Sequence, residues 1–274
     1  MPLIPRFDGD VVRAGSLRRF MPFLMKGRNE SAVYFAQRLD VGPTLTWLRQ
    51  NPEYTFFHVV LAAILRTLVA RPAMNRFVVG RTLYQRRSLS MGFAVKKRFA
   101  DDAKLTTVKI EFDPTDTIAD IKRRIDTAIG EGRGDADTTS EREMNVVAAL
   151  PGPIIGLVMW VQRLLDGWNL LPAAMIRPDP LYSSVFLANL GSIGLEAPFH
   201  HLYEYGTTPL FAVIGRIHKD QWVDDDGTVD VRDTVMIRWT FDERICDGLY
   251  CARSLDLMKG FLAAPDAAPD ASSA

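Results

Sequence analysis

Near its C-terminus the chain runs from a strand through a charged turn directly into a helix. Residues 234–240 are expected to form a β-strand. Residues 248–262 have helical spacing, and Asp247 stands where a helix accepts a capping carboxylate. The turn between them carries Asp242, Glu243 and Arg244. The spacing therefore predicts a capped helix that begins a few residues after a strand.

Strand and helix patterns alternate along the rest of the chain. Residues 54–70 have apolar side chains at helical spacing and stop before Pro72. Residues 113–130 predict a second helix, ended by Gly130. The hairpin expected at 78–84 has Gly80 in its turn. Further strands are expected at 87–95, 105–112, 184–189 and 210–215. This order predicts an α/β sandwich.

One stretch, residues 146–161, contains no charged side chain. A membrane span needs about twenty apolar residues, and Pro151 and Pro153 interrupt this stretch. The wider segment 146–176 has two interpretations. It forms a buried helical hairpin or a contact in an oligomer, or it is an apolar lid that touches an acyl chain or a membrane surface, as Trp160 and Trp168 suggest.

We expect a single domain over residues 1–262. Within it, residues 131–180 contain a polar, glycine-rich loop at 131–141 and then the apolar insertion. Residues 263–274 are of low complexity and are expected to form a disordered tail.

Charge and cysteine content restrict the class of protein. The 274 residues include 33 basic and 33 acidic side chains, so the net charge is zero and gives no electrostatic reason to bind nucleic acid. Cys246 and Cys251 are five positions apart and point in different directions on a helix, so we expect no disulfide and a reducing, cytoplasmic location. The first residues lack the basic start and apolar core of a signal peptide.

The charged turn resembles a known catalytic motif. Residues 240–248 read Thr-Phe-Asp-Glu-Arg-Ile-Cys-Asp-Gly. This is similar to the Asp-His-Arg-x-x-Asp-Gly motif of the dihydrolipoyl acyltransferases of 2-oxo acid dehydrogenase complexes, and to the His-x-x-x-Asp-Gly motif of chloramphenicol acetyltransferases. The resemblance covers residues 15–130 and 180–262. It implies a chloramphenicol acetyltransferase-like two-layer α/β sandwich with a mixed sheet, into which the apolar helical segment is inserted.

Glu243 stands where this family has its catalytic histidine. In the family a neutral imidazole takes a proton from the thiol of coenzyme A or of dihydrolipoamide. A carboxylate with an ordinary pKa of about 4.3 is a poor base toward a thiol whose pKa is near 8.5. Only a dry pocket would raise the pKa of Glu243 enough. The alternative is a structural carboxylate that pairs with Arg244 or another arginine.

A second family position differs in the stretch 185–191. The family has a serine or threonine there, whose hydroxyl donates to the oxyanion, and this chain has Ala188. Losing one such donor costs about 10²–10³ in rate. Asn189 and Gly191 match the family, so we expect the local turn to be kept. For Asp247 two roles stay open together: the helix cap, and the family's ion pair with an N-terminal arginine, here Arg18 or Arg19.

Two adjacent histidines, His200 and His201, follow this turn. Neighbouring side chains on a strand face opposite sides, and no third ligand stands at metal spacing, so no metal site is expected. One imidazole approaching Glu243 would give a substitute acid–base pair; a hydrogen-bonded structural role is the alternative.

The resemblance implies a stand-alone homologue of the dihydrolipoyl acyltransferase catalytic domain with impaired or lost transfer activity. It would act as an oligomeric acyl- or CoA-binding or assembly protein. The alternative is an active CoA-dependent acyltransferase that uses Glu243, with His200 or His201, on an unknown acceptor. We expect a homotrimer or a multiple of three, no covalently bound cofactor, coenzyme A or acyl-CoA as the ligand, and contact with a membrane surface only as the less favoured alternative.

Overall fold

The computed structural model describes residues 4–96, 105–133 and 145–266. Its main sheet has six strands in the order β2-β9-β8-β7-β5-β6. The pairs β5–β7 and β7–β8 are parallel and the other neighbours are antiparallel, so the sheet is mixed, as predicted. The strands are β2 (Ala32–Asp40), β5 (Leu89–Lys96), β6 (Leu105–Phe112), β7 (Val185–Asn189), β8 (Leu210–Val223) and β9 (Val229–Asp242).

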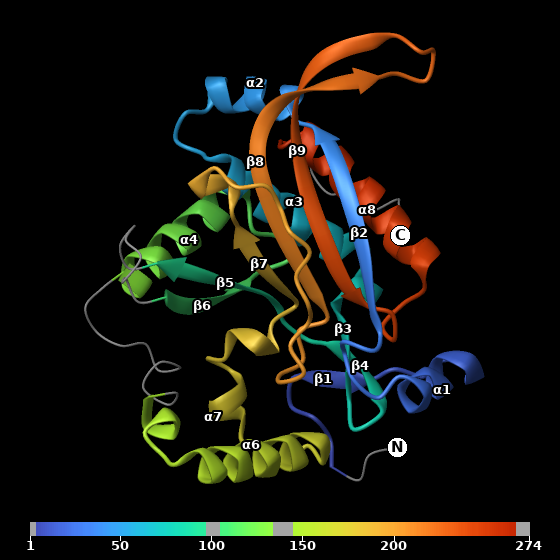
Figure 1. Cartoon of the computed structure of the whole chain (residues 1–274), viewed down its shortest axis with the longest axis vertical. Helices are drawn as coiled ribbons and strands as arrows, with labels where there is room; N and C mark the ends of the chain where they lie inside the picture. The colour runs from blue at the N-terminus through green and yellow to red at the C-terminus, as the bar shows by residue number, and fades with distance from the viewer. Residues whose placement is uncertain (1–3, 97–104, 134–144, 267–274) are drawn as a thin grey trace.

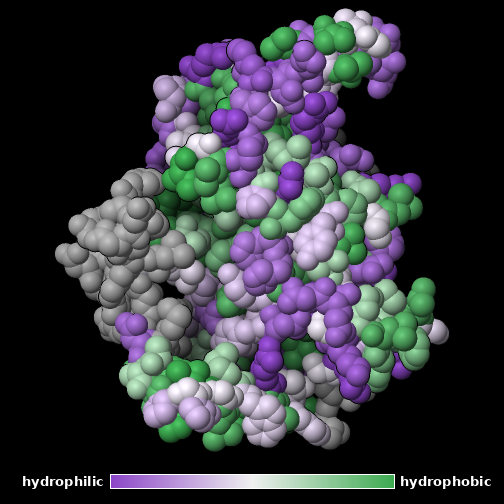
Figure 2. All heavy atoms as spheres, in the orientation of Figure 1, coloured by the Kyte–Doolittle hydropathy of each residue, from purple (hydrophilic) through white to green (hydrophobic). Residues whose placement is uncertain are grey.

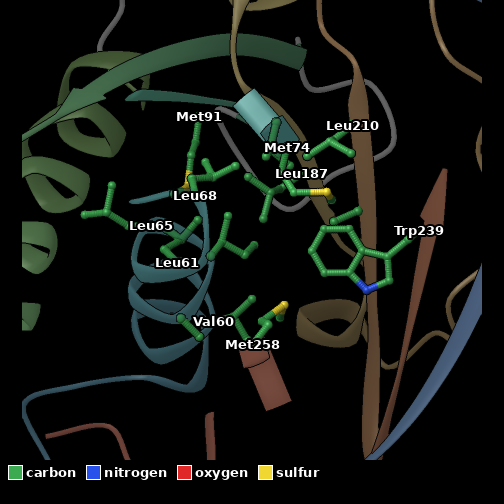
Figure 3. Packing of buried hydrophobic residues seen from close by; sticks show 14 of the residues in the cluster. Val60, Leu61, Leu65, Leu68, Met74, Met91, Leu187, Leu210, Trp239 and Met258 are labelled. Atoms are coloured by element: carbon green, nitrogen blue, oxygen red, sulfur yellow. The ribbon is translucent and has the colours of Figure 1, made fainter. Parts of the chain in front are cut away.

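Helices cover one face of this sheet and enclose the main core (Figure 1). They are α2 (Gly42–Gln50), α3 (Phe56–Ala70), α4 (Ile118–Arg133) and α8 (Gly248–Ala263). Figure 3 shows Leu61 of α3 and Met258 of α8 on the side of α3 that faces Leu187 and Trp239 of the sheet, while Leu65 lies on the other side of α3. All of these side chains are buried. Burial of one such large side chain contributes roughly 1.5–3 kcal/mol, so this layer contact supplies most of the driving force for the fold.

The central helix α3 ends at Ala70, as the sequence predicts, and begins at Phe56, two residues after the predicted start. Thr55 is its N-cap, and the Thr55 backbone N–H donates to Nδ1 of His58 at 3.1 Å. The helix is buried along most of its length, which agrees with its apolar side chains on every side. Pro72 cannot continue a helix, and a short 3-10 helix, η1 (Pro72–Asn75), follows.

A second, three-stranded sheet lies beside the N-terminal helix α1 (Ser16–Leu24). Its strands, in the order β1-β4-β3, are β1 (Gly9–Val11), β4 (Thr82–Arg86) and β3 (Arg76–Val79). The predicted hairpin at 78–84 is confirmed. Gly80 and Arg81 both have positive φ, 53° and 65°, as a two-residue hairpin turn requires. A Cβ on Gly80 would lie 2.3 Å from the carbonyl oxygen of Gly167, so only glycine fits there.

The last two strands extend well beyond the main sheet. β8 and β9 each have fourteen residues and remain paired as far as Val223 and Val229, so residues 219–233 project as a two-stranded arm (Figure 1). The predicted strands at 210–215 and 234–240 were too short. A signal for the longer strands is Asp226-Gly227, which is typical of a hairpin turn and is followed by residues 229–233, where valine alternates with polar residues.

The other face of the sheet is covered in part by an extended segment, residues 194–209. Ala197 and Leu202 of this segment pack against Phe186, Phe211 and Val213, which point away from the helices. Two short 3-10 helices, η2 (Pro180–Tyr182) and η3 (Gly191–Ile193), precede it. The sheet therefore has a small second core beneath this segment.

The apolar insertion folds as α6 (Gly152–Gly167) and the single turn α7 (Ala173–Ile176). α6 lies along one end of the molecule (Figure 1), and its only buried residue is Asp166. Leu157 is 58% exposed and Trp160 is 60% exposed. The interpretation of α6 as a helix buried within one chain is therefore wrong. A contact with another subunit, or with lipid, stays a prediction.

Polar contacts hold the C-terminal end of α6 to the rest of the molecule. Asp166 accepts a hydrogen bond from the buried guanidinium of Arg6 at 2.8 Å and one from the Tyr182 hydroxyl at 3.3 Å. Gln162 donates to the Tyr205 hydroxyl at 2.8 Å. Desolvation and the nearby carboxylates raise the pKa values of Tyr182 and Tyr205, so both hydroxyls remain protonated donors.

Two predicted boundaries are wrong. α4 continues past Gly130 to Arg133, because one glycine near a helix end costs only about 1 kcal/mol; the rest of the loop expected at 131–141 lies outside the described residues. The start of the predicted disordered tail is held in place, since the carbonyl of Pro265 accepts from Arg66 at 2.6 Å. Residues 267–274 lie outside the described part of the chain.

Candidate active site

The turn after β9 is built around a buried ion pair. The guanidinium of Arg244 donates to both carboxylate oxygens of Asp242, at 2.8 and 2.7 Å, and the two residues are 3% and 1% exposed. Ser31 donates its hydroxyl to the same carboxylate at 2.9 Å. Arg244 also donates to the backbone carbonyls of Met25 and Lys26. This paired and hydrogen-bonded arrangement fixes the backbone on both sides of Glu243.

Glu243 is held by its backbone alone. Its N–H donates to the carbonyl of Ser31 at 2.9 Å, and its carbonyl accepts from Arg18 at 2.6 Å. The side chain is half-buried, and no described residue forms an ion pair or a hydrogen bond with its carboxylate. The expected pairing with Arg244 is therefore not formed, because Asp242 occupies that guanidinium. The chain presents a carboxylate at the position where the family motif has its base.

Asp247 has both of the roles expected for it. Its carboxylate accepts from the backbone N–H of Tyr250 at 2.8 Å and so caps α8. It also lies 3.9 Å from the guanidinium of Arg18, in an exposed ion pair. Arg18 thus bonds both ends of the motif, the carbonyl of Glu243 and the carboxylate of Asp247.

The second candidate position lies at the end of β7. The side chain of Ala188 is partly buried against the small core under residues 194–209 and offers no donor. Asn189 accepts from the backbone N–H of Ser192 at 3.2 Å, which holds the expected turn. A Cβ on Gly191 would lie 2.3 Å from the carbonyl of Gly215. The turn thus matches the family pattern in shape, while the hydroxyl that would serve an oxyanion is absent from position 188.

Ala188 and Glu243 are far apart within one chain. Ala188 is paired with Val213, and Val213 is paired with Arg238. Glu243 lies five residues beyond Arg238, which is about 17 Å at roughly 3.4 Å per residue. A single chain therefore does not bring the two positions together.

The two histidines belong to an aromatic stack. The ring of His200 lies 3.9 Å from the Phe211 ring and 4.7 Å from the His201 ring, measured between centroids. Their Nδ1 atoms contact backbone carbonyls, of His201 at 2.8 Å and of Leu202 at 3.0 Å. Burial lowers the pKa of His200. No hydrogen bond or ion pair joins either imidazole to Glu243 among the described residues, so the structure gives them a packing role.

Two cavities adjoin the motif. One, of about 530 Å³, is lined by Arg28, Arg81, Arg163, Glu204 and Arg244 among others. The other, of about 820 Å³, is a groove between α1 and the β3–β4 turn, and Arg18 lines it. Glu243 lines neither of them. The single chain therefore offers no site in these cavities that would bring the thiol of coenzyme A to this carboxylate.

Two further side chains support the motif and were missed in the sequence. Arg28 is buried, and it donates to the carbonyl of Glu204 at 2.8 Å. Burial opposes ionisation of Glu204, but hydrogen bonds from the backbone N–H groups of Asn29 and Arg28 outweigh it and lower the pKa of this carboxyl. An isolated Arg or Glu carries no local pattern that predicts such long-range pairing.

The remaining reactive groups show no second site in the described residues. Burial raises the pKa of the Cys246 and Cys251 thiols to about 12, and both are free and buried. At neutral pH they are protonated and poor nucleophiles. No group of three metal-ligating side chains gathers in the parts of the chain that the structure describes. None of the helices described is long and apolar enough to cross a bilayer.

Comparison with known proteins confirms the resemblance. Residues 181–268 match the model of the family described as 2-oxoacid dehydrogenases acyltransferase (catalytic domain). A search of curated proteins finds no significant match to the sequence.

Solved structures of similar fold confirm the fold class. A probable dihydrolipoamide acetyltransferase from Listeria monocytogenes has a TM-score of 0.61 and 15% identity, over 95% of this chain and 98% of that one. The dihydrolipoamide acetyltransferase of Azotobacter vinelandii also has a TM-score of 0.61 and 15% identity, over 97% of this chain and 98% of that one. Its structure was determined in a study of the role of a serine, a histidine and an asparagine in its catalytic mechanism. A chloramphenicol acetyltransferase has a TM-score of 0.53 and 12% identity, over 93% of this chain and 99% of that one. The fold is therefore that of these acyltransferase catalytic domains.

Proposed function

We propose that this chain is a homologue of the dihydrolipoyl acyltransferase catalytic domain in which acyl transfer is impaired or lost, and that it acts as an oligomeric acyl- or CoA-binding or assembly protein. One observation carries the proposal: the frame of the motif is complete, through Asp242, Arg244 and Asp247, while Glu243 replaces the base. Ala188 adds a second departure. Loss of a general base costs about 10²–10⁴ in rate, and loss of an oxyanion donor about 10²–10³.

The test is acetyl transfer from acetyl-CoA to dihydrolipoamide or to chloramphenicol by the purified protein. We expect no turnover above the uncatalysed rate, together with CoA or acyl-CoA binding detectable by calorimetry. Robust turnover of either acceptor would contradict the proposal. A combined variant, Glu243→His with Ala188→Ser, restores the two functional groups in the existing frame, and measurable transfer by it would locate the defect at these positions.

The alternative is an active CoA-dependent acyltransferase that uses Glu243. The observation in its favour is the unpaired carboxylate, since a base must be free of a cationic partner to accept a proton. The stacking of His200 on Phe211 and of His201 on His200 gives no support to their participation. If transfer to some acceptor is found, Glu243→Gln decides: abolished transfer supports this alternative, and unchanged transfer excludes it.

The proposal includes a homotrimer or a multiple of three. Three facts support it. Ala188 and Glu243 are far apart in one chain, α6 is uncovered, and a structure of similar fold, with a TM-score of 0.58, is the cubic core of a pyruvate dehydrogenase multienzyme complex, an assembly whose symmetry includes threefold axes. Light scattering at micromolar concentration tests the assembly, and a monomeric mass would exclude it.

A further inference from the structure

The groove between α1 and the β3–β4 turn is unusual in charge. Its volume is about 820 Å³, and its lining includes Arg13, Arg18, Arg19 and Arg81 but no aspartate or glutamate. Apolar side chains form the rest of its surface, among them Val11, Phe20, Phe23 and Leu83. Phe20 is 55% exposed and Phe23 is 50% exposed. The groove thus combines a cationic rim with an uncovered apolar floor.

Three of the four arginines of the groove lack an ion-pair partner among the described residues, as some exposed arginines elsewhere on the surface also do. Arg38, Arg87, Arg216 and Arg232 are also surface residues, and each forms an ion pair with a carboxylate. In contrast, Arg13, Arg19 and Arg81 are exposed, and no carboxylate of the described residues lies within ion-pair distance of them. Arg81 lies over the ring of Phe23, at 5.2 Å from its centroid. In a chain of zero net charge, the groove therefore has unmatched positive charge.

The arm of residues 219–233 has the opposite character. It contains six aspartates, at 220, 224, 225, 226, 230 and 233, against Lys219 and Arg232. Asp225 and Asp226 lie exposed at its tip, beside the turn at Gly227. Val223 is paired with Val229 across the two strands, and both are about 60% exposed, at 60% and 62%. The arm thus carries an anionic tip and an uncovered apolar face.

We infer that the arm of one copy of this chain docks into the groove of the next copy. Each of the two surfaces supplies what the other lacks, namely carboxylates for the arginines and valines for the apolar floor. The arm does not serve its own groove, because the two lie at opposite ends of the molecule (Figures 1 and 2). Such a head-to-tail contact closes into a ring when the rotation between copies allows it. The inference rests on the proposed oligomer and names the surfaces that form it.

Charge reversal tests the contact without touching the core. One variant carries Asp225→Arg and Asp226→Arg, a second carries Arg19→Asp and Arg81→Asp, and a third carries all four changes. A matched control carries Glu53→Arg and Asp256→Arg, which reverse exposed acids outside the arm. We expect each of the first two to raise the dissociation constant of the oligomer about tenfold or more, the control to leave it unchanged, and the fourfold variant to restore it.

Each outcome decides a specific claim. A monomeric mass for the unaltered protein excludes the oligomer and, with it, this contact. An oligomer whose mass and dissociation constant are unaffected by either reversal excludes the contact alone. Failure of the folded fourfold variant to reassemble also overturns it. If the groove variant keeps its mass but loses binding to phosphatidylcholine–phosphatidylglycerol vesicles that the unaltered protein binds, the groove is a lipid-docking surface and the inference is wrong.

Discussion

The turn that follows β9 and the helix α6 differ in which side chains they bury. In the turn, Asp242 and Arg244 are fully buried, and their charges are matched by one another, by Ser31 and by backbone groups. In α6, Asp166 is the only buried residue, and the apolar side chains are the ones left in water. The turn is complete within one chain. α6 has its polar anchor within the chain, but it lacks a partner for its apolar surface.

This difference separates what folding needs from what assembly needs. The turn follows the rule that buried charges are paired, and its contacts involve segments about 220 residues apart in the chain. An apolar helix that is exposed on several sides is stable only when something else covers it. We therefore expect substitutions in the turn to change the stability of the single chain, and substitutions on α6 to change its association.

The largest effect is expected for Asp242→Ala. The change leaves the guanidinium of Arg244 buried without its carboxylate, which costs about 3–5 kcal/mol in the free energy of unfolding. Denaturant unfolding measures it, with the exposed Asp256→Ala as control, for which less than about 0.5 kcal/mol is expected. A loss below about 1 kcal/mol for Asp242→Ala would show that the turn is not the self-sufficient region described here.

Asp166→Ala should give an intermediate and local effect. It removes the acceptor of Arg6 and of the Tyr182 hydroxyl, and hydrogen bonds to a charged group contribute about 1.5–3 kcal/mol. Hydrogen exchange should show lost protection in residues 152–167, with the strands of the main sheet unchanged. Arg163→Ala, on the same helix, is the control. Equal protection of α6 in both variants would mean that the polar anchor does not hold the helix.

Asp247→Ala should cost about 1 kcal/mol of stability, the usual loss for a helix N-cap. The ion pair with Arg18 adds little, because it is exposed and its atoms are 3.9 Å apart. Asp247→Asn keeps the capping oxygen and loses the charge, so it should retain most of the stability in thermal unfolding. An Asn variant as unstable as the Ala variant would assign the effect to the charge.

The smallest effect concerns pH and lies in the packed layer, at His58. Burial lowers the pKa of this imidazole, Asp126 acts in the opposite direction, and Lys122 lowers it further. The folded state therefore favours the neutral ring, whose Nδ1 accepts from the backbone of Thr55. The stabilisation of the folded state by this neutral ring is complete above the pKa of an unfolded histidine, near 6.5. It is lost as the pH falls through the lower pKa of His58 in the folded state.

The free energy of unfolding, measured at several pH values between 5 and 8, tests this contribution of His58. The protein should lose more of its free energy of unfolding than a His58→Gln variant does as the pH is lowered. Identical slopes in the two proteins would exclude His58 as the titrating group.

Local patterns were sufficient to predict the central elements. Helix α3, the hairpin around Gly80 and the Asp247 cap each depend on neighbouring residues, so spacing and capping rules place them correctly. The C-terminal motif predicted the fold, and its catalytic role stays a prediction. The arm differs: the strands predicted at 210–215 and 234–240 do not include it, although Asp226-Gly227 is a strong turn signal.

Long-range contacts could not be predicted in the same way. The pairing of Arg244 with Asp242 rather than with Glu243 depends on where the turn bends and on Ser31, which lies far away in the sequence. The stacking of His200 on Phe211 depends on the path of residues 194–209 across the sheet. Whether an apolar segment is covered depends on partners, which a single sequence does not contain.

The free carboxylate of Glu243 has a consequence for how such a protein changes over evolutionary time. Because the surrounding turn is fixed by backbone bonds and by the Asp242–Arg244 pair, the identity of side chain 243 has almost no influence on folding. Selection for a stable protein therefore does not act on this position. Side chain 243 can therefore change by single substitutions that keep the hydrogen bonds of the surrounding turn, so the identity of this residue and the architecture evolve independently at this point.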